Sequence, residues 1–541
     1  MQRRTFLQSS LLASAGLVFT RRYAQAFSAA DTQVEILLDE PLGTIAPEIY
    51  GQFTEQLGGV IYDGVWVGEG SKIPNQAGIR SALIEKLRAI RMPVCRWPGG
   101  CFADSYDWKD GIGPRAKRPT RTNFWEDAGF KQLHGKGVQI YEDNAFGTDD
   151  FLRFCKLTGA QPYLAANLRS LPALDFDHWI EYCNSPAGST TLANQRAANG
   201  SRDPYNVRYW GVGNEAWGCG GTFSPEDYAS EFRRFTTWVP RYGLDLQLVG
   251  SGPNGDDVSW THRFFDALFT GSRYYDHNTI WGWSVHHYSN YPKSNAIRFD
   301  PVDWYELLQQ ADLMEPIIRD HWAALAEYDP AHHVSLVVDE YGPWYESGTE
   351  IDPTHIFGQQ ITVRDALATA LTLDTFNRNA EKVGMAACAQ LVNCINSLFL
   401  AHEDNFITTP NYNVFAMYAP HMGAKAVRAE FFAQEVHYQR DGKPAKFWGL
   451  KGSASRKDKM LTLTLVNPSL TEARDTEIVL RGGSAASATG TVLTASDVHA
   501  HNTFAQPDAV KTASLQVTLD GSNLRCTVPP ASVVAIQAQL G

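Results

Sequence analysis

Two kinds of hydrophobic pattern alternate along the chain between residues 49 and 393. Short runs rich in Val, Ile, Leu, Trp and Tyr predict buried strands, whereas longer stretches with an apolar residue every three or four positions predict amphipathic helices. The helical pattern is clear at residues 78–91, where Ile79, Leu83 and Leu87 share one face. Eight candidate strands alternate with such stretches, at residues 49–55, 93–99, 162–167, 208–215, 246–252, 280–288, 335–341 and 384–393.

The starts of these eight strands lie about 35–70 residues apart, which leaves room for a helix after each one. Strands that alternate with helices favour a parallel sheet, and eight such units predict a closed (β/α)8 TIM barrel. The predicted fold class is therefore α/β, with the catalytic barrel over residues 49–427. One helix is expected to start at Pro225, because Ser224 is a preferred cap and proline suits the first helical turn.

A different pattern begins at residue 428, where apolar residues recur at every second position. Leu461, Leu463 and Leu465 would point to one face of a strand and the threonines between them to the other, as in a strand with one buried face. Residues 428–541 are therefore predicted to form an all-β sandwich, to which an early strand within residues 31–48 is expected to add. Its further strands are expected at residues 476–480, 514–519, 524–528 and 532–539.

Residues 1–30 have the pattern of an export signal rather than of a folded element. Arg3 and Arg4 form a twin-arginine pair, an apolar stretch follows at residues 11–19, and residues 24–26 (AQA) offer a cleavage site. The apolar stretch is too short to span a bilayer as a mature helix. We therefore expect a periplasmic or extracellular protein; a frayed N-terminal helix is the alternative.

Composition narrows the function further. The chain has 541 residues, 44% of them hydrophobic, and a net charge of −12, which fits a soluble globular protein and disfavours nucleic-acid or anionic-membrane partners. Eight scattered cysteines, without a Cys-x-x-Cys pair, are expected to be mostly buried thiols. No metal or other cofactor is expected; a structural ion stays open, although the sequence contains no calcium-loop pattern.

Candidate chemistry lies at the carboxyl ends of the predicted strands, where barrel enzymes place their catalytic groups. Two carboxylates among Trp and Tyr residues suggest glycoside hydrolysis, in which one acid protonates the leaving oxygen and the other attacks carbon or activates water. Taken singly, each residue also suits a loop, a helix cap or a buried ion pair. The strand-end groups are Glu55, Arg96, Asn214, Glu215, His286, His287, Tyr288, Asp339 and Glu340.

Several segments together resemble glycoside hydrolase family 51, whose typical members are α-L-arabinofuranosidases. The most specific are YWGVGNEAWGCGG at residues 209–221, RWPGGCFAD at 96–104 and VDEY at 338–341. The resemblance extends over nearly the whole chain from residue 34 and implies a barrel with a β-sandwich of jelly-roll type. Further agreement comes from GQFTEQL, DGIGP, FGT, QLVN and PPASVV, which start at residues 51, 110, 146, 390 and 529.

The resemblance implies a retaining double displacement with Glu215 as the acid/base and Glu340 as the nucleophile. Such an enzyme holds its two carboxyl groups about 5–5.5 Å apart. By the same resemblance, His286 supports the acid/base, Arg96 and Tyr288 keep the nucleophile ionised, and Trp125 forms a wall beside the sugar. The remaining implied substrate-binding residues are Glu55, Asn214, Gln390 and, where some relatives carry asparagine, Cys101.

The leading hypothesis is an exported enzyme that releases terminal α-L-arabinofuranosyl residues from plant-type polysaccharides or oligosaccharides. An endoglucanase or β-xylosidase of the same broad family and a non-catalytic carbohydrate-binding protein are the alternatives, and a homo-oligomer stays open. Residues 126–142 look longer than the corresponding family loop and include Lys131, His134 and Lys136. A long loop at the active face would change the subsites.

Overall fold

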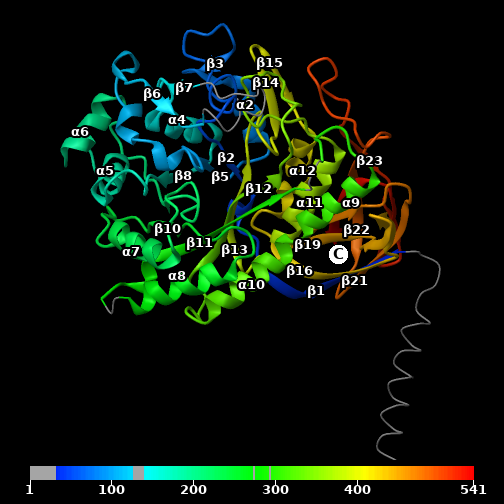
Figure 1. The fold of residues 1–541 in the computed structure, drawn as a ribbon. Coiled ribbons are helices and arrows are strands. Elements are labelled where there is room, and N and C mark those ends of the chain that lie inside the picture. Colours follow the sequence, from blue (N-terminus) through cyan, green and yellow to red (C-terminus); the bar gives the residue numbers. More distant parts are fainter. Residues whose placement is uncertain (1–31, 126–138, 272–273, 291–293) are drawn as a thin grey trace, which may run out of the picture.

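The structure is a computed structural model that describes residues 32–125, 139–271, 274–290 and 294–541 (Figure 1). It combines a closed barrel of eight strands with a β-rich C-terminal part. Residues 1–31 and 126–138 lie outside the described residues, so the predicted export signal and most of the long loop do too. No helix in the described ranges is long and apolar enough to cross a membrane.

All eight predicted barrel strands are present, and each pairs in parallel with its neighbours. The TIM barrel is therefore confirmed. Several predicted segments overran the strand into the loop at its carboxyl end, because the apolar pattern continues there. In barrel order the strands are β2 (Gly51–Phe53), β5 (Val94–Trp97), β8 (Gln161–Ala166), β9 (Tyr209–Val212), β10 (Gln247–Gly250), β11 (Ile280–Ser289), β12 (Ser335–Pro343) and β13 (Val383–Ala389).

Helices follow the strands and bury the apolar faces that their periodicity predicts. Helix α7 begins at Pro225, as expected, and the Ser224 side chain accepts a hydrogen bond from the backbone N–H of Asp227. The described helices are α2 (Ser81–Ala89), α4 (Thr148–Thr158), α5 (Ala173–Asn184), α6 (Thr191–Ala198), α7 (Pro225–Thr236), α8 (Val258–Thr270), α9 (Pro301–Asp312), α10 (Met314–Ala326), α11 (Val363–Arg378) and α12 (Pro410–Tyr418).

Four short β-hairpins lie in the described loops between the main helices and strands. Three of them belong to loops that leave the carboxyl ends of barrel strands β2, β5 and β13, so they surround the face where the candidate chemistry lies. They are β3 (Asn75–Gln76) with β4 (Ile79–Arg80), β6 (Arg121–Asn123) with β7 (Ile140–Glu142), and β14 (Phe399–His402) with β15 (Asn405–Thr408). A fourth pairs β17 (Val436–Arg440) with β18 (Lys443–Phe447).

The C-terminal part is one ten-stranded sheet that curls so that β22 approaches β24 and β25. The N-terminal strand β1 lies inside this sheet, antiparallel to β16 and parallel to β21. Val34 and Ile36 of β1 pack into its core with Leu461 and Leu463. In sheet order the strands are β23 (Thr512–Leu515), β22 (Ala485–Leu493), β26 (Ser532–Leu540), β20 (Met460–Asn467), β19 (Lys451–Lys457), β16 (Lys425–Ala433), β1 (Thr32–Thr44), β21 (Arg474–Arg481), β25 (Asn523–Val528) and β24 (Thr518–Asp520).

Strand β20 is buried on both faces, which corrects the expectation of one polar, exposed face. Thr462 and Thr464 are only 3% and 0% exposed. The reason is that barrel helix α11 covers the outer face of the sheet: Asp374 of α11 accepts hydrogen bonds from Thr464 and from Ser453 of β19, at 2.5 and 2.6 Å. Figure 1 shows α11 beside β19, at the junction between the two parts.

Candidate active site

Two glutamates come together at the carboxyl ends of barrel strands β9 and β12. Glu340 lies within β12, and Glu215 follows the end of β9 with a left-handed backbone (φ 39°). Strand pairing places His286 of β11 directly beside Glu340. One ring nitrogen of His286 and one carboxylate oxygen from each glutamate all lie within 4.8 Å of one another. The two carboxylates are thus neighbours, with a histidine between them.

Both carboxylate oxygens of Glu340 accept a hydrogen bond. Nη1 of Arg96 donates to Oε1, and the hydroxyl of Tyr288 donates to Oε2, each at 2.7 Å. The side chain is only 7% exposed. These two donors orient the carboxylate, so Arg96 and Tyr288 lie where the resemblance placed them, against the expected nucleophile.

The guanidinium of Arg96 is buried at the centre of the site. It lies over the rings of Phe53 and Tyr163, and it donates to the backbone oxygen of Asp339 at 3.2 Å and to Oδ1 of Asn214 at 2.6 Å. Burial acts to lower the pKa of Arg96, but the carboxylates of Asp339 and Glu340 outweigh it and raise the pKa above its usual value. Arg96 is therefore a permanent buried cation.

His286 is a second buried cation, held among three carboxylates. Nδ1 lies 3.0 Å from Oε1 of Glu215 and 3.5 Å from Oε2 of Glu340, and Nε2 lies 3.1 Å from Oδ1 of Asp339. Burial acts to lower the pKa of His286, but the charge of Glu340 and the hydrogen bonds to Asp339 and Glu215 raise it to about 10. The imidazolium therefore donates to Glu215 from Nδ1 and to Asp339 from Nε2.

Glu55 and Gln390 form a hydrogen-bonded pair near Glu340. Nε2 of Gln390 donates to Oε2 of Glu55 at 2.8 Å, and the backbone N–H of Phe102 donates to Oε1 at 3.1 Å. Burial, reinforced by the charge of Glu340, raises the pKa of Glu55 to about 8. At neutral pH Glu55 therefore carries a proton.

Asn214 is held by a residue that the sequence interpretation missed, Asp104. This buried carboxylate accepts from the backbone N–H groups of Leu168, Arg169 and Asn214, at 2.8, 3.0 and 3.0 Å. It thereby joins the loops that follow β5, β8 and β9. Asp104 lies in the RWPGGCFAD segment, but the sequence contains no signal for contacts to loops so distant along the chain. Asp339 was likewise noted only as the neighbour of Glu340, although it binds both buried cations.

Cys101 is not a free thiol, which corrects the expectation for this residue. It forms a disulfide with Cys219, whose Cα atom is 5.6 Å away. The two sulfur atoms lie 3.6 and 3.5 Å from Oε2 of Glu215, but neither carries a hydrogen to donate. The other six cysteines are buried and free, as expected.

Trp125 belongs to a row of aromatic side chains that leads to Tyr288, which bonds to Glu340. Its ring packs edge-on against Phe357 at 5.7 Å, Phe357 packs against Trp344 at 5.2 Å, and Trp344 packs against Tyr288 at 5.0 Å. Trp344 and Phe357 were not among the predicted site residues. Both lie in the loop after β12, where the sequence offered no motif to single them out.

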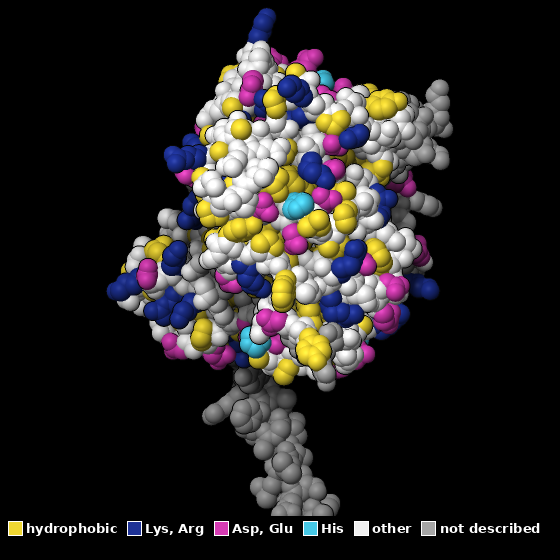
Figure 2. Space-filling model, turned by 90° about the vertical axis from the view of Figure 1, so that its left-hand side faces the viewer, with side chains coloured by type: hydrophobic (Ala, Val, Ile, Leu, Met, Phe, Trp, Pro, Cys, Tyr) yellow, Lys and Arg dark blue, Asp and Glu magenta, His cyan; other side chains and the backbone are white. Residues whose placement is uncertain are grey.

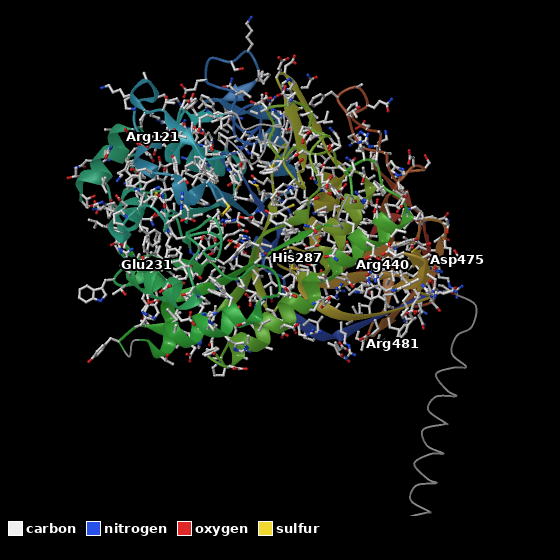
Figure 3. All side chains as sticks on the ribbon, in the orientation of Figure 1. Arg121, Glu231, His287, Arg440, Asp475 and Arg481 are labelled. Carbon is white, nitrogen blue, oxygen red and sulfur yellow. A yellow bond between two sulfur atoms is a disulfide. The ribbon has the colours of Figure 1, made fainter. Side chains whose placement is uncertain are left out.

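His287 is not part of the site, because alternation along β11 directs it away from its neighbour His286. Its Nε2 bonds to the backbone oxygen of Gln310 at 2.7 Å, on helix α9 (Figure 3). One further cluster with metal-ligating side chains lies outside the site in the described part of the chain: Asp63 and His355 from loops and His402 at the end of strand β14. Hydrogen bonds from the two histidines to Asp63 account for this cluster, at 3.3 and 2.9 Å.

Comparisons with known proteins agree with this site. Residues 86–298 match the family model "Alpha-L-arabinofuranosidase 1 domain", and residues 339–532 match "Alpha-L-arabinofuranosidase C-terminal domain". An "Intracellular exo-alpha-L-arabinofuranosidase" from Bacteroides ovatus is 34% identical over 516 residues, which cover 94% of this chain and 95% of the relative. The chain belongs to glycoside hydrolase family 51.

Solved structures of this family superpose on nearly the whole chain. A family 51 arabinofuranosidase from Xanthomonas axonopodis pv. citri is 34% identical, with a TM-score of 0.87 over 94% of this chain and 100% of that structure. An α-L-arabinofuranosidase from Thermotoga maritima, solved with arabinose, is 28% identical, with a TM-score of 0.80 over 94% and 100%. The resemblance inferred from the sequence motifs is confirmed, and this family 51 protein is a glycoside hydrolase.

Gly100→Ala is expected to impair catalysis without unfolding the protein. A Cβ atom on Gly100 would overlap Oε1 of Glu340 and displace the carboxylate. Misplacing a reacting group by about 1 Å can cost about 10²-fold in rate, so kcat/KM should fall by at least that factor. Gly218→Ala is the control, because its Cβ would meet nothing closer than 3.7 Å. Equal rates for the two variants would contradict the assigned position of Glu340.

Glu55→Gln is expected to make the free energy of unfolding less dependent on pH. Since burial raises the pKa of Glu55 from 4.5 to about 8, the folded state binds this proton more tightly than the unfolded chain between those values. The stability of the wild type should therefore fall with rising pH there, by at most about 1.4 kcal/mol per pH unit from this group. Glutamine has no proton to lose. Urea unfolding across this range checks the prediction, and identical slopes would contradict a protonated Glu55.

Proposed function

We propose that this protein is a retaining, exo-acting α-L-arabinofuranosidase that releases terminal arabinofuranosyl residues from plant-type polysaccharides or oligosaccharides. The observation that carries the proposal is the approach of the Glu215 and Glu340 carboxylates to within 4.8 Å. Retaining enzymes hold their carboxyl groups about 5–5.5 Å apart, whereas inverting enzymes need about 6.5–9.5 Å to admit water. The arabinofuranosidases among the relatives support the choice of sugar.

In the first step, an oxygen of Glu340 attacks the anomeric carbon while Glu215 transfers its proton to the departing glycosidic oxygen. Arg96 and Tyr288 hold both oxygens of Glu340 and so fix its line of attack. Glu215 becomes a carboxylate as the aglycone leaves. The imidazolium of His286, 3.0 Å from Oε1, stabilises that new charge.

In the second step, the Glu215 carboxylate removes a proton from water, and the resulting hydroxide attacks the anomeric carbon. The bond to Glu340 breaks, and the sugar leaves with its original configuration. Asn214 can act on the sugar itself: Arg96 holds its Oδ1, and Nδ2, which donates one hydrogen to Sγ of Cys219 at 3.8 Å, has a second hydrogen to donate to a furanose hydroxyl. A contact that strengthens in the transition state adds directly to the rate.

A panel of aryl glycosides tests the substrate class and the nucleophile together. We expect the highest kcat/KM for the α-L-arabinofuranoside, above the β-D-xyloside, β-D-glucoside and β-D-galactofuranoside. Glu340→Gln should lower turnover by roughly 10³-fold or more, because a neutral amide cannot form the glycosyl ester. Glu346→Gln, an exposed glutamate beyond the same strand, is the control. A preference for another glycoside, or a fully active Glu340→Gln, would refute the assignment.

We also propose that the protein is exported through the twin-arginine route. The support is the Arg3–Arg4 pair and the Cys101–Cys219 disulfide, since disulfides persist in oxidising compartments. Charges of both signs are interspersed on the face that Figure 2 shows, without a large positive area that would suit a membrane surface. The Bacteroides ovatus relative is named intracellular, so the two proteins would differ in location.

Replacing both Arg3 and Arg4 by lysine should retain the enzyme in the cytoplasm. Twin-arginine signals are read by a receptor rather than by charge alone, so lysine should not substitute. The amount of the protein in cytoplasmic and periplasmic fractions, measured by immunoblot, shows the effect independently of activity. The control replaces the other arginine pair of this segment, Arg21 and Arg22, by lysine. Wild-type protein confined to the cytoplasm would overturn the export proposal.

A further inference from the structure

The Cys101–Cys219 disulfide lies directly against one oxygen of the proposed acid/base. The two sulfur atoms are 3.6 and 3.5 Å from Oε2 of Glu215, whereas Oε1 contacts His286. In the described part of the chain, no other donor approaches Oε2. This oxygen is therefore the one that can carry the proton destined for the aglycone.

A disulfide and a pair of thiols present different chemistry to that oxygen. Disulfide sulfurs have no hydrogen, so they cannot stabilise a carboxylate at Oε2 by donating to it. Reduction breaks the S–S bond, so the two sulfur atoms must separate to van der Waals contact. Each then carries an S–H group that lies close enough to Oε2 to turn toward it. Donors directed at a carboxyl group favour its ionised form. S–H donors at Oε2 would thus stabilise the carboxylate form of Glu215 relative to the protonated acid that the first step consumes.

We propose that Cys101 and Cys219 are positioning residues whose disulfide keeps Oε2 of Glu215 free of hydrogen-bond donors, and that their reduction weakens general-acid catalysis. The proposal rests on the proposed function, in which Glu215 is the acid/base. The reductant is a dithiol. It forms a mixed disulfide with one cysteine and then closes to a cyclic disulfide, so two electrons and two protons pass to Cys101 and Cys219.

Hydrogen bonds also hold the backbone around Glu215, in addition to the disulfide. The N–H of Ala216 donates to the Ser251 hydroxyl at 3.1 Å, and the N–H of Gly218 donates to the Glu215 carbonyl at 2.7 Å. Both bonded cysteines are partly exposed and within reach of a small dithiol, whereas the six free cysteines are buried. Reduction should therefore change the hydrogen bonding at Glu215 while the fold persists.

The test compares oxidised and reduced wild-type enzyme on two aryl α-L-arabinofuranosides. One has a 2,4-dinitrophenolate leaving group, which needs no protonation, and the other has a poor phenolate. General-acid catalysis contributes about 10²–10⁴-fold, so we expect reduction to lower kcat/KM for the poor leaving group at least about tenfold. The activated substrate should change less than about twofold, and reoxidation should restore the rate.

Two double variants separate hydrogen bonding from tethering. Cys101→Ala with Cys219→Ala lacks both the tether and the donors, so it should behave like the oxidised enzyme with or without reductant. Cys101→Ser with Cys219→Ser keeps hydroxyl donors, so it should behave like the reduced enzyme. Equal losses in both variants, on both substrates, would show a tether and overturn the proposal.

The wild-type comparison stands even if a variant fails to fold. Two additional thiols in the native protein verify that the bond has been reduced, and unchanged rates on both substrates would then refute the inference. Glu215→Ala distinguishes this failure from that of the proposed function. If it impairs the poor leaving group selectively, Glu215 is the acid and only the inference fails; if it does not, the acid/base assignment itself is wrong.

Discussion

The buried guanidinium of Arg96 is the contact on which the rest of the site depends. Asp339, Glu340 and the proposed acid/base Glu215 occupy one small region, and at about 4 Å two like charges repel by about 4 kcal/mol even at an effective dielectric constant of 20. Arg96 and the imidazolium of His286 supply the compensating charge. Glu55 is also near Glu340, but it keeps its proton at neutral pH and so adds no further negative charge.

Because the site depends on Arg96, the ends of the barrel strands that carry its partners must be placed accurately. Arg96 and Glu340 are 244 residues apart in sequence and meet only because β5 and β12 end at the same face. A buried ion pair stabilises a structure only when its geometry and remaining hydrogen bonds are complete. The packing of Arg96 between Phe53 and Tyr163 and its bond to Asn214 provide this completion. The electrostatics of the site therefore constrain several strands at once.

The sequence predicted those parts of the structure that leave a local pattern. Barrel strands are short apolar runs, and their ends carry Glu215 and Glu340, so both the fold class and the neighbouring carboxylates were accessible. Contacts between segments that are distant in sequence could not be predicted in this way. Thr464 has the polarity of an exposed residue, and only the position of helix α11 explains its burial. Asp104 and the Cys101–Cys219 pair likewise depend on loops whose approach no spacing encodes.

The disulfide also connects the two proposals of location and redox control. A twin-arginine substrate folds before export, so Cys101 and Cys219 would already be adjacent as thiols in the reducing cytoplasm. There their S–H groups would face Oε2 of Glu215 and weaken general-acid catalysis. The bond would form after export, and the six buried cysteines could not compete for it. Under both proposals, the enzyme would be weakly active in the cytoplasm, where it is made. It would become fully active after export, because oxidation removes the two S–H hydrogens of Cys101 and Cys219 beside Glu215.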